Sequence, residues 1–265
     1  MRYRRLVEQL RTQNWTAIGI DLVIVVVGVF IGIQMANWNE GRTTARRAEI
    51  FTERLKSDLR EEAWGYEMQV GYYGDVVANG RRALDALAGR APLSDEALLV
   101  SAYRATQYNG NIRRRATYDE LTSRGEIGLV ADGVLRDLAQ RVYTAPMFDY
   151  IVEEGRTSPY RGWFRRSMPH DVQQALADRC GDRNVVVGDY AGINMSLDYA
   201  CSTKLPAESV TAAVALLRGD PEAQRVLRVR VADVDTGVTN LTVYYADMRR
   251  GLQAVAKASP RSAKT

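Results

Sequence analysis

The feature that most constrains this chain is an apolar run near its N-terminus, AIGIDLVIVVVGVFIGIQMA, over residues 17–36. Its 20 residues hold two strongly polar side chains, Asp21 near the start and Gln34 near the end. As a helix, the run would be about 30 Å long, which matches the hydrocarbon core of a bilayer. Trp15 and Trp38 bracket it, and indoles favour the headgroup level. The sequence therefore predicts one transmembrane helix over residues 17–38.

A cleaved signal peptide is the alternative, but its apolar region is about 7–15 residues long. The run here is longer, and no small-x-small site with suitable flanks follows it. Four arginines lie in residues 1–16 and three in residues 37–52, so the positive-inside rule weakly favours a cytoplasmic N-terminus. We expect a short cytoplasmic tail over residues 1–16 and an extracytoplasmic domain over residues 39–258.

The two cysteines, Cys180 and Cys201, support the same orientation. An even cysteine count in an extracytoplasmic domain indicates a disulfide. The segment between them is rich in Gly, Asn and Asp, and closing a loop of that length contributes about 3 kcal/mol in the chain-entropy model. Two reduced cysteines, buried as small apolar side chains, are the alternative.

Small residues recur every four positions within the span, at Gly28, Gly32 and Ala36. Such a stripe lets two helix backbones approach closely. Offsets of seven and eleven residues place Gly28 and Gly32 within about 20° of Asp21 around a helix. The pattern indicates a packing face for a second copy or another membrane protein, with Asp21 as a polar contact or a proton site. Alternatively, Asp21 is simply hydrated at the headgroup level.

The rest of the chain has helical periodicity, so we expect an all-α, bundle-like domain. The first long helix continues from the span, and its apolar stripe runs from Ala48 to Leu87. Glycines at 65, 71, 74 and 80 weaken this helix, so a break or kink is expected there, and Gly89–Pro92 ends it.

Several later helices have recognisable starts and stops. A helix over about 94–108 starts at Ser94, and a helix after Asp132 is interrupted at Pro146. Thr117 and Glu120 have the spacing of a capping box, with Gly125 as the stop. Asp220-Pro221 begins a final helix whose apolar spacing runs unbroken from Leu227 to Val255. Residues 259–265 are expected to be disordered.

Composition and motifs exclude several classes of activity. The net charge is +4, and basic residues are scattered except for Arg113-Arg114-Arg115, so nucleic-acid binding is not expected. The only histidine is His170, which begins a predicted helix, and no C-x-x-C, G-x-S-x-G or G-x-x-x-x-G-K motif occurs. We expect no cofactor, no metal and no catalytic residue. The acid pairs Asp119-Glu120 and Glu153-Glu154 leave a carboxylate-based site open.

The chain resembles an uncharacterised family of bacterial single-span membrane proteins. The resemblance rests on Gln34, Asn37, Trp38, Asn39 and Glu40 at the end of the span and on Tyr118, Leu121, Ser123 and Gly125. It covers the anchor closely and the domain loosely, and the cysteine pair is outside the family pattern. It implies a bacterial inner-membrane protein of unknown activity, in which Asn37, Asn39 and Glu40 cap or bridge neighbouring chains at the interface.

Together these features predict a non-enzymatic, single-pass inner-membrane protein. Its partners would be the lipid bilayer and either a second copy or another membrane protein, and its periplasmic helical domain would mediate interactions or sense a ligand that the sequence does not identify. The rival hypotheses are an accessory subunit of a proton-coupled complex that uses Asp21, and a membrane-tethered enzyme with a carboxylate-based site.

Overall fold

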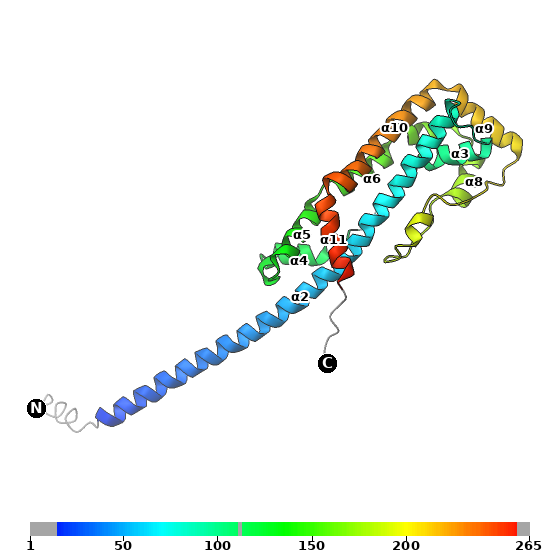
Figure 1. Ribbon diagram of the computed structural model, residues 1–265. Helices are drawn as coiled ribbons and strands as arrows, with labels where there is room; N and C mark the ends of the chain where they lie inside the picture. Colours follow the sequence, from blue (N-terminus) through cyan, green and yellow to red (C-terminus); the bar gives the residue numbers. More distant parts are fainter. Residues whose placement is uncertain (1–14, 111–112, 259–265) are drawn as a thin grey trace, which may run out of the picture. The chain divides into compact units, whose positions relative to one another are not determined.

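The computed structural model describes residues 15–110 and 113–258, with only the helix described for residues 15–18. The expected tail over residues 259–265, and all but the last two residues of the tail over 1–16, lie outside the described residues. The described part of the chain is all-helical and holds no strand, which confirms the all-α class that the sequence predicted (Figure 1). Contacts divide the chain into a first unit, residues 1–52 and 128–131, and a second unit, residues 53–127 and 132–265.

Helix α2, Trp15–Leu87, contributes to both units and contains 73 residues. Its part in the first unit carries the apolar run. The short helix η1, Ile127–Leu129, begins in the second unit and ends in the first, and the second unit contains the remaining helices. The others are α3 (Asp95–Arg104), α4 (Ala116–Ser123), α5 (Gly133–Thr144), α6 (Met147–Thr157), α7 (Pro159–Ser167), α8 (His170–Cys180), η2 (Gly192–Met195), α9 (Ala207–Gly219), α10 (Pro221–Thr239), the π-helical turn η3 (Asn240–Tyr244) and α11 (Ala246–Lys257).

The core of the second unit surrounds α2 and a cluster formed by α3, α7, α8, α9 and the start of α10. Leu55, Leu59, Tyr66 and Tyr73 are buried, as the apolar stripe predicted. Trp64, Met68 and Tyr72 are buried as well, so α2 is covered on more than one face. Most of its stabilisation must therefore come from tertiary packing rather than from helix propensity.

The expected break at the glycines of α2 is wrong. The helix runs through all four, and two of them are points of close approach. A Cβ on Gly71 would lie 2.6 Å from Ile193 Cγ2, and one on Gly80 would lie 2.5 Å from Val231 Cγ2. Glycine is required at positions 71 and 80 because a side chain there would collide with its neighbour. The backbone freedom of glycine is not used, since both residues are helical.

Three of the predicted helix starts are confirmed by their caps. The side chains of Ser94, Asp132 and Asp220 accept hydrogen bonds from the backbone N–H groups of Ala97, Leu135 and Glu222. Gly125, with φ of 68°, follows the end of α4 as expected. The helix after Ser94 is shorter than predicted and ends at Arg104.

The predicted capping box is also wrong. Helix α4 begins one residue before Thr117, whose backbone N–H donates to Asp58 Oδ2 of α2 at 3.3 Å. Glu120 is paired with Arg54 and Arg124 instead of capping the helix. A carboxylate from a different helix thus supplies the acceptor that the local sequence was expected to supply.

The final helix is not continuous, since the π-helical turn η3 separates α10 from α11. The hydroxyl group of Tyr66, which is buried on α2, donates to the carbonyl oxygen of Leu241 at 2.6 Å. Burial raises the pKa of this phenol far above its ordinary value. This hydrogen bond gives the carbonyl oxygen of Leu241 a partner within the π-helical turn. It lies at the point where α10 gives way to α11.

Candidate functional site

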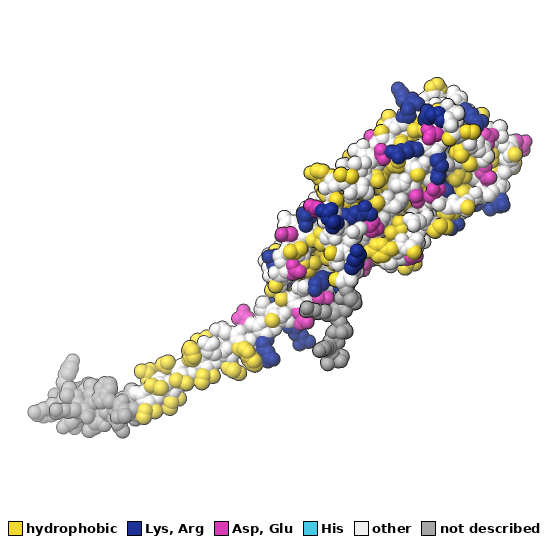
Figure 2. All heavy atoms as spheres, in the orientation of Figure 1, with side chains coloured by type: hydrophobic (Ala, Val, Ile, Leu, Met, Phe, Trp, Pro, Cys, Tyr) yellow, Lys and Arg dark blue, Asp and Glu magenta, His cyan; other side chains and the backbone are white. Residues whose placement is uncertain are grey.

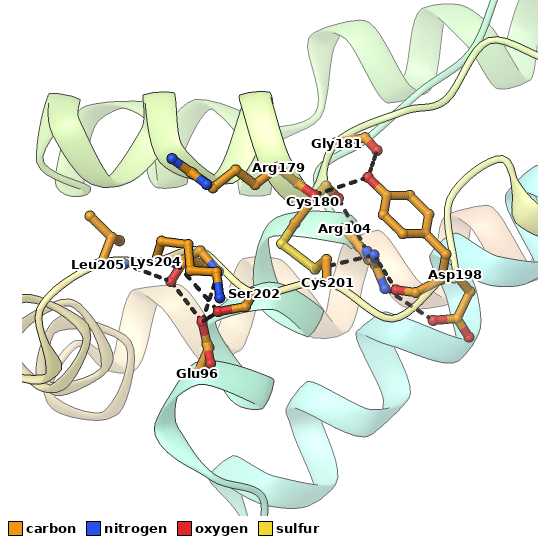
Figure 3. The surroundings of a disulfide bond; sticks show 12 residues. Glu96, Arg104, Arg179, Cys180, Gly181, Asp198, Cys201, Ser202, Lys204 and Leu205 are labelled. Carbon is orange, nitrogen blue, oxygen red and sulfur yellow. Dashed lines mark hydrogen bonds and ion pairs between the residues drawn. A yellow bond between two sulfur atoms is a disulfide. The ribbon is translucent and has the colours of Figure 1, made fainter.

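The cysteine pair singled out by the sequence forms a disulfide, with the two Cα atoms 5.5 Å apart (Figure 3). Cys180 is the last residue of α8, and Cys201 lies in the connection to α9. The bond closes a loop over residues 181–200, which we call the bracketed segment. It contains η2 and no other helix.

Arg104 of α3 forms hydrogen bonds and an ion pair with residues at both ends of the bracketed segment. Only 4 % of its side chain is exposed. Its guanidinium group donates to the carbonyl oxygens of Cys180 at 3.3 Å and Tyr199 at 2.7 Å, and it pairs with Asp198 at 3.2 Å (Figure 3). Burial lowers the pKa of Arg104, and the charge of Asp198 opposes that effect. The base of the segment is therefore rigidly held.

Further contacts fix the bracketed segment against α2. The indole N–H group of Trp64 donates to the carbonyl oxygen of Asp189 at 3.1 Å, and the hydroxyl group of Tyr72 donates to Asp182 Oδ1 at 2.8 Å. Ile193 fits against Gly71, as described above. These contacts place η2 beside the middle of the second-unit part of α2.

A hollow of about 620 Å³ lies where α2, the bracketed segment and α11 meet. We call it the α11 hollow. Its lining residues are Glu67, Val70, Gly71, Tyr190, Ile193, Asn194, Arg249, Gln253, Ala256 and Lys257. Its volume lies within the range of small-molecule sites, about 300–1,000 Å³.

One polar network forms part of the wall of the α11 hollow. Glu67 accepts two hydrogen bonds from Arg249, at 2.8 and 2.5 Å, and one from Gln253 at 2.8 Å. Burial works to raise the pKa of Glu67, but the hydrogen bonds from Arg249 and Gln253 outweigh it and leave this pKa below the ordinary value. Glu67 is therefore ionised at neutral pH and neutralised by Arg249.

The remaining polar groups of the α11 hollow are available to a ligand. Among the described residues, the side chains of Tyr190, Asn194 and Lys257 have no hydrogen-bond partner, and Tyr190 is 45 % exposed. Val70, Ile193 and Ala256 supply apolar surface. The arrangement suits a small molecule with one apolar face and a few polar groups. No group of three or more metal-ligating side chains occurs in the described part of the chain.

The residues of the predicted membrane packing face all lie on the exposed surface of the first unit. Asp21, Gly28, Gly32 and Ala36 are exposed, and a Cβ on either glycine would have no atom within 4 Å. This part of α2 is long and apolar enough to cross a membrane, and none of its apolar window is buried. Figure 2 shows hydrophobic side chains crowding the visible surface of this stretch.

The five residues of the predicted interface motif lie in different surroundings. Asn37 and Glu40 line a shallow hollow of about 600 Å³ within the first unit, together with Gly128 and Leu129. Trp38 instead lies under the guanidinium group of Arg42, 4.5 Å from the ring centroid. Gln34 and Asn39 are exposed and do not line this hollow. The side chain of Trp15 lies outside the described residues.

Several charged residues that sequence reasoning did not single out are buried in the second unit. Arg230 of α10 is 1 % exposed; it pairs with Glu154 and donates to the carbonyl oxygens of Ala105 at 3.2 Å and Gln107 at 2.7 Å. A signal was present, because Arg230 falls three residues after Leu227 and four before Val234 on the buried face. The arginine triplet is acid-paired, through Arg113–Glu62, Arg114–Glu61 and Arg115–Asp119.

Comparison of the chain with models of protein families, with curated proteins and with solved structures found no match.

Proposed function

We propose that this chain is a single-pass protein of a bacterial inner membrane, with a cytoplasmic N-terminus and a periplasmic helical domain that binds a partner or senses a small ligand. The observation that carries the proposal is the bare apolar stretch of α2. Its large side chains from Ile20 to Met35 are between 47 and 64 % exposed, far more apolar surface than water-soluble chains leave contiguous. A bilayer is the surrounding that removes this surface from water.

The disulfide supports the proposed side of the membrane. Disulfides persist in oxidising compartments and are rare in the cytosol. The four arginines before the span agree with this orientation. Membership of the single-span family remains part of the proposal, as does association through Gly28, Gly32 and Ala36 with a second copy or another membrane protein.

The α11 hollow is the proposed ligand site of the domain. It is bordered by three segments distant in sequence, so a ligand in it would contact α2, the bracketed segment and α11 together. Binding would therefore favour one arrangement of these segments over others, which is the physical requirement for a sensor.

Reporter fusions test the orientation. Alkaline phosphatase fused after Thr265 should be active, and green fluorescent protein fused at the same position should be dark. The reverse pair of signals would contradict a periplasmic domain. Alkylation of the folded protein without reductant should leave Cys180 and Cys201 unlabelled, with labelling after reduction as the control.

A further inference from the structure

A second hollow, of about 460 Å³, is lined by residues of α11, α2 and α5 that do not line the α11 hollow. Figure 1 shows these three helices in the second unit. We call this hollow the α5 groove. Its apolar lining includes Val134, Leu135, Leu138 and Val255, and its charged lining consists of Glu53, Lys56, Arg60, Asp132 and Arg141. It shares no lining residue with the α11 hollow.

Arg60 is the unusual member of this lining. Its side chain is partly buried, its Nε atom is fully buried, and no described residue accepts a hydrogen bond from it or pairs with it. Three other arginines of the second unit, whose side chains are 16 % exposed or less, each have a carboxylate partner, namely Arg104 with Asp198, Arg113 with Glu62 and Arg230 with Glu154. A buried guanidinium N–H donor without an acceptor is costly, which indicates that an anion from outside the described chain accepts from Arg60.

The other charges of the α5 groove leave room for that anion. Glu53 pairs with Lys56 at 2.8 Å, and Asp132 accepts the backbone N–H group of Leu135 as the cap of α5. Among the described residues, the only hydrogen-bond acceptor for the side chain of Arg141 is the backbone carbonyl oxygen of Asp137, at 3.4 Å. Both carboxylates of the groove thus have partners of their own. The guanidinium groups of Arg60 and Arg141 also line the groove, and neither is paired with a carboxylate of the described residues.

The apolar lining of the α5 groove indicates that the anion is attached to a hydrocarbon chain. Leu135 and Leu138 are 5 and 3 % exposed and form the floor, while Val134 is 78 % exposed at the rim. A free inorganic anion would leave the exposed apolar surface around Val134 in water, whereas a hydrocarbon chain would cover it and gain about 25 cal/mol for each Å² buried. The available volume suits one short chain rather than two.

We propose that the α5 groove binds a single-chain anionic amphiphile, with its carboxylate or phosphate head at Arg60 and its hydrocarbon chain along α5 and α11. The inference does not depend on the proposed ligand site in the α11 hollow or on the proposed orientation.

The test uses the full chain in nanodiscs of zwitterionic phosphatidylcholine, which expose both faces of the bilayer. The probe is a dodecanoate that carries a photoreactive diazirine, and its attachment sites are mapped by peptide mass spectrometry. Labelling is expected on the peptides that contain residues 132–141 and 251–258. Labelling confined to the apolar run of α2 would overturn the proposal, because it would report only partition into the bilayer.

Competition distinguishes the chemistry of the head group. Unlabelled dodecanoate and dodecyl phosphate should both remove the groove label, and their ratio would tell a fatty acid from a phosphate ester. Equal competition by dodecanol would contradict a role for the guanidinium group. Full competition by inorganic phosphate would contradict a role for the apolar walls. These measurements use the unmodified protein, so they remain decisive if a variant fails to fold.

Two matched variants complete the test. Arg60→Gln removes the unpaired charge and should lower groove labelling about tenfold, as expected for loss of one charge-assisted hydrogen bond. Arg228→Gln removes an exposed arginine of α10 that does not line the groove, and its labelling should equal that of the unmodified protein. Equal labelling of Arg60→Gln and the unmodified protein would overturn the assignment of the head group to Arg60.

Discussion

Helix α2 contains two pairs of glycines in opposite surroundings. A Cβ on Gly28 or Gly32, in the first unit, would have no atom within 4 Å. A Cβ on Gly71 or Gly80, in the second unit, would lie 2.6 Å from Ile193 or 2.5 Å from Val231. The same residue type in the same helix is thus unpacked in one unit and required by packing in the other. The difference teaches that glycines spaced along a helix do not by themselves show that another helix or loop packs against them; the packed element has to be identified in the structure.

Acidic residues show the same contrast. Asp21 is exposed in the first unit and has no ion-pair partner among the described residues. Glu154 in the second unit is 13 % exposed and is paired with Arg230. The second unit thus neutralises Glu154 internally, whereas any neutralising partner for Asp21 has to come from outside the described chain. The following changes test this contrast, from the largest expected effect to the smallest.

Arg230→Met should cause the largest loss of stability. The substitution keeps most of the side-chain volume but leaves Glu154 and the carbonyl oxygens of Ala105 and Gln107 without their donor. Removing one partner of a buried pair costs about 3–5 kcal/mol. Urea unfolding followed by near-ultraviolet circular dichroism measures the change. Asp21→Asn is the control and should leave the unfolding midpoint unchanged. Equal midpoints for Arg230→Met and the unmodified protein would contradict internal neutralisation.

Gly80→Ala and Gly74→Ala should have opposite effects, although both lie in α2. The new Cβ at position 80 would overlap Val231, and overpacking costs about 1–3 kcal/mol. At position 74 no atom lies within 4 Å, so the higher helix propensity of alanine should stabilise the protein by up to about 1 kcal/mol. Thermal unfolding of the two variants under identical conditions measures the difference. If both substitutions raised the stability, helix propensity rather than contact with a neighbouring side chain would determine the effect at these two positions.

Asp75→Asn should raise stability above pH 6 and leave it nearly unchanged at pH 4. Burial, and then the nearby charge of Asp198, raise the pKa of Asp75 to about 6, and its Oδ2 atom is buried without a partner among the described residues. The unfolded chain has an aspartate pKa of about 3.9, so the folded state binds the proton more tightly. Stability therefore falls as pH rises between these two values.

The measurement for Asp75 is a pair of unfolding curves at pH 4 and pH 7.5. We expect the variant to exceed the unmodified protein by on the order of 1–2 kcal/mol at pH 7.5 only, which is less than the full pKa difference implies because Asp75 keeps some contact with solvent. A constant difference at both pH values would mean that ionisation of Asp75 does not destabilise the fold.

Gly28→Leu should have the smallest effect on the domain and a clear effect on association. The side chain would project from an open surface, so the unfolding midpoint should not move. If a second span packs on this face, the larger side chain blocks it sterically. Val26→Leu, on the opposite face of the helix, is the matched control. A membrane two-hybrid assay of residues 1–42 measures association. An unchanged signal for Gly28→Leu would contradict self-association through this face.

Some predictions succeeded because they depended on neighbours in sequence. Ser94, Asp132 and Asp220 cap their helices through N–H groups two or three residues away, and Pro146 separates α5 from α6. The cysteine pair could be joined because the chain has only two cysteines. The α11 hollow could not be predicted, since its Glu67–Arg249 pair joins residues 182 positions apart.

Local sequence by itself determined that this chain is helical, where α3, α5 and α10 begin, and that one stretch of α2 is apolar. These properties follow from spacing and caps within a few residues. Only the tertiary structure decided that Gly80 receives Val231, that Asp58 caps α4 and that Tyr66 bonds the π-helical turn. It also decided that Arg60, unlike Arg104 and Arg230, has no carboxylate partner among the described residues. The physical reason is that burial and partner choice depend on elements far apart in the sequence, whose approach no local pattern encodes.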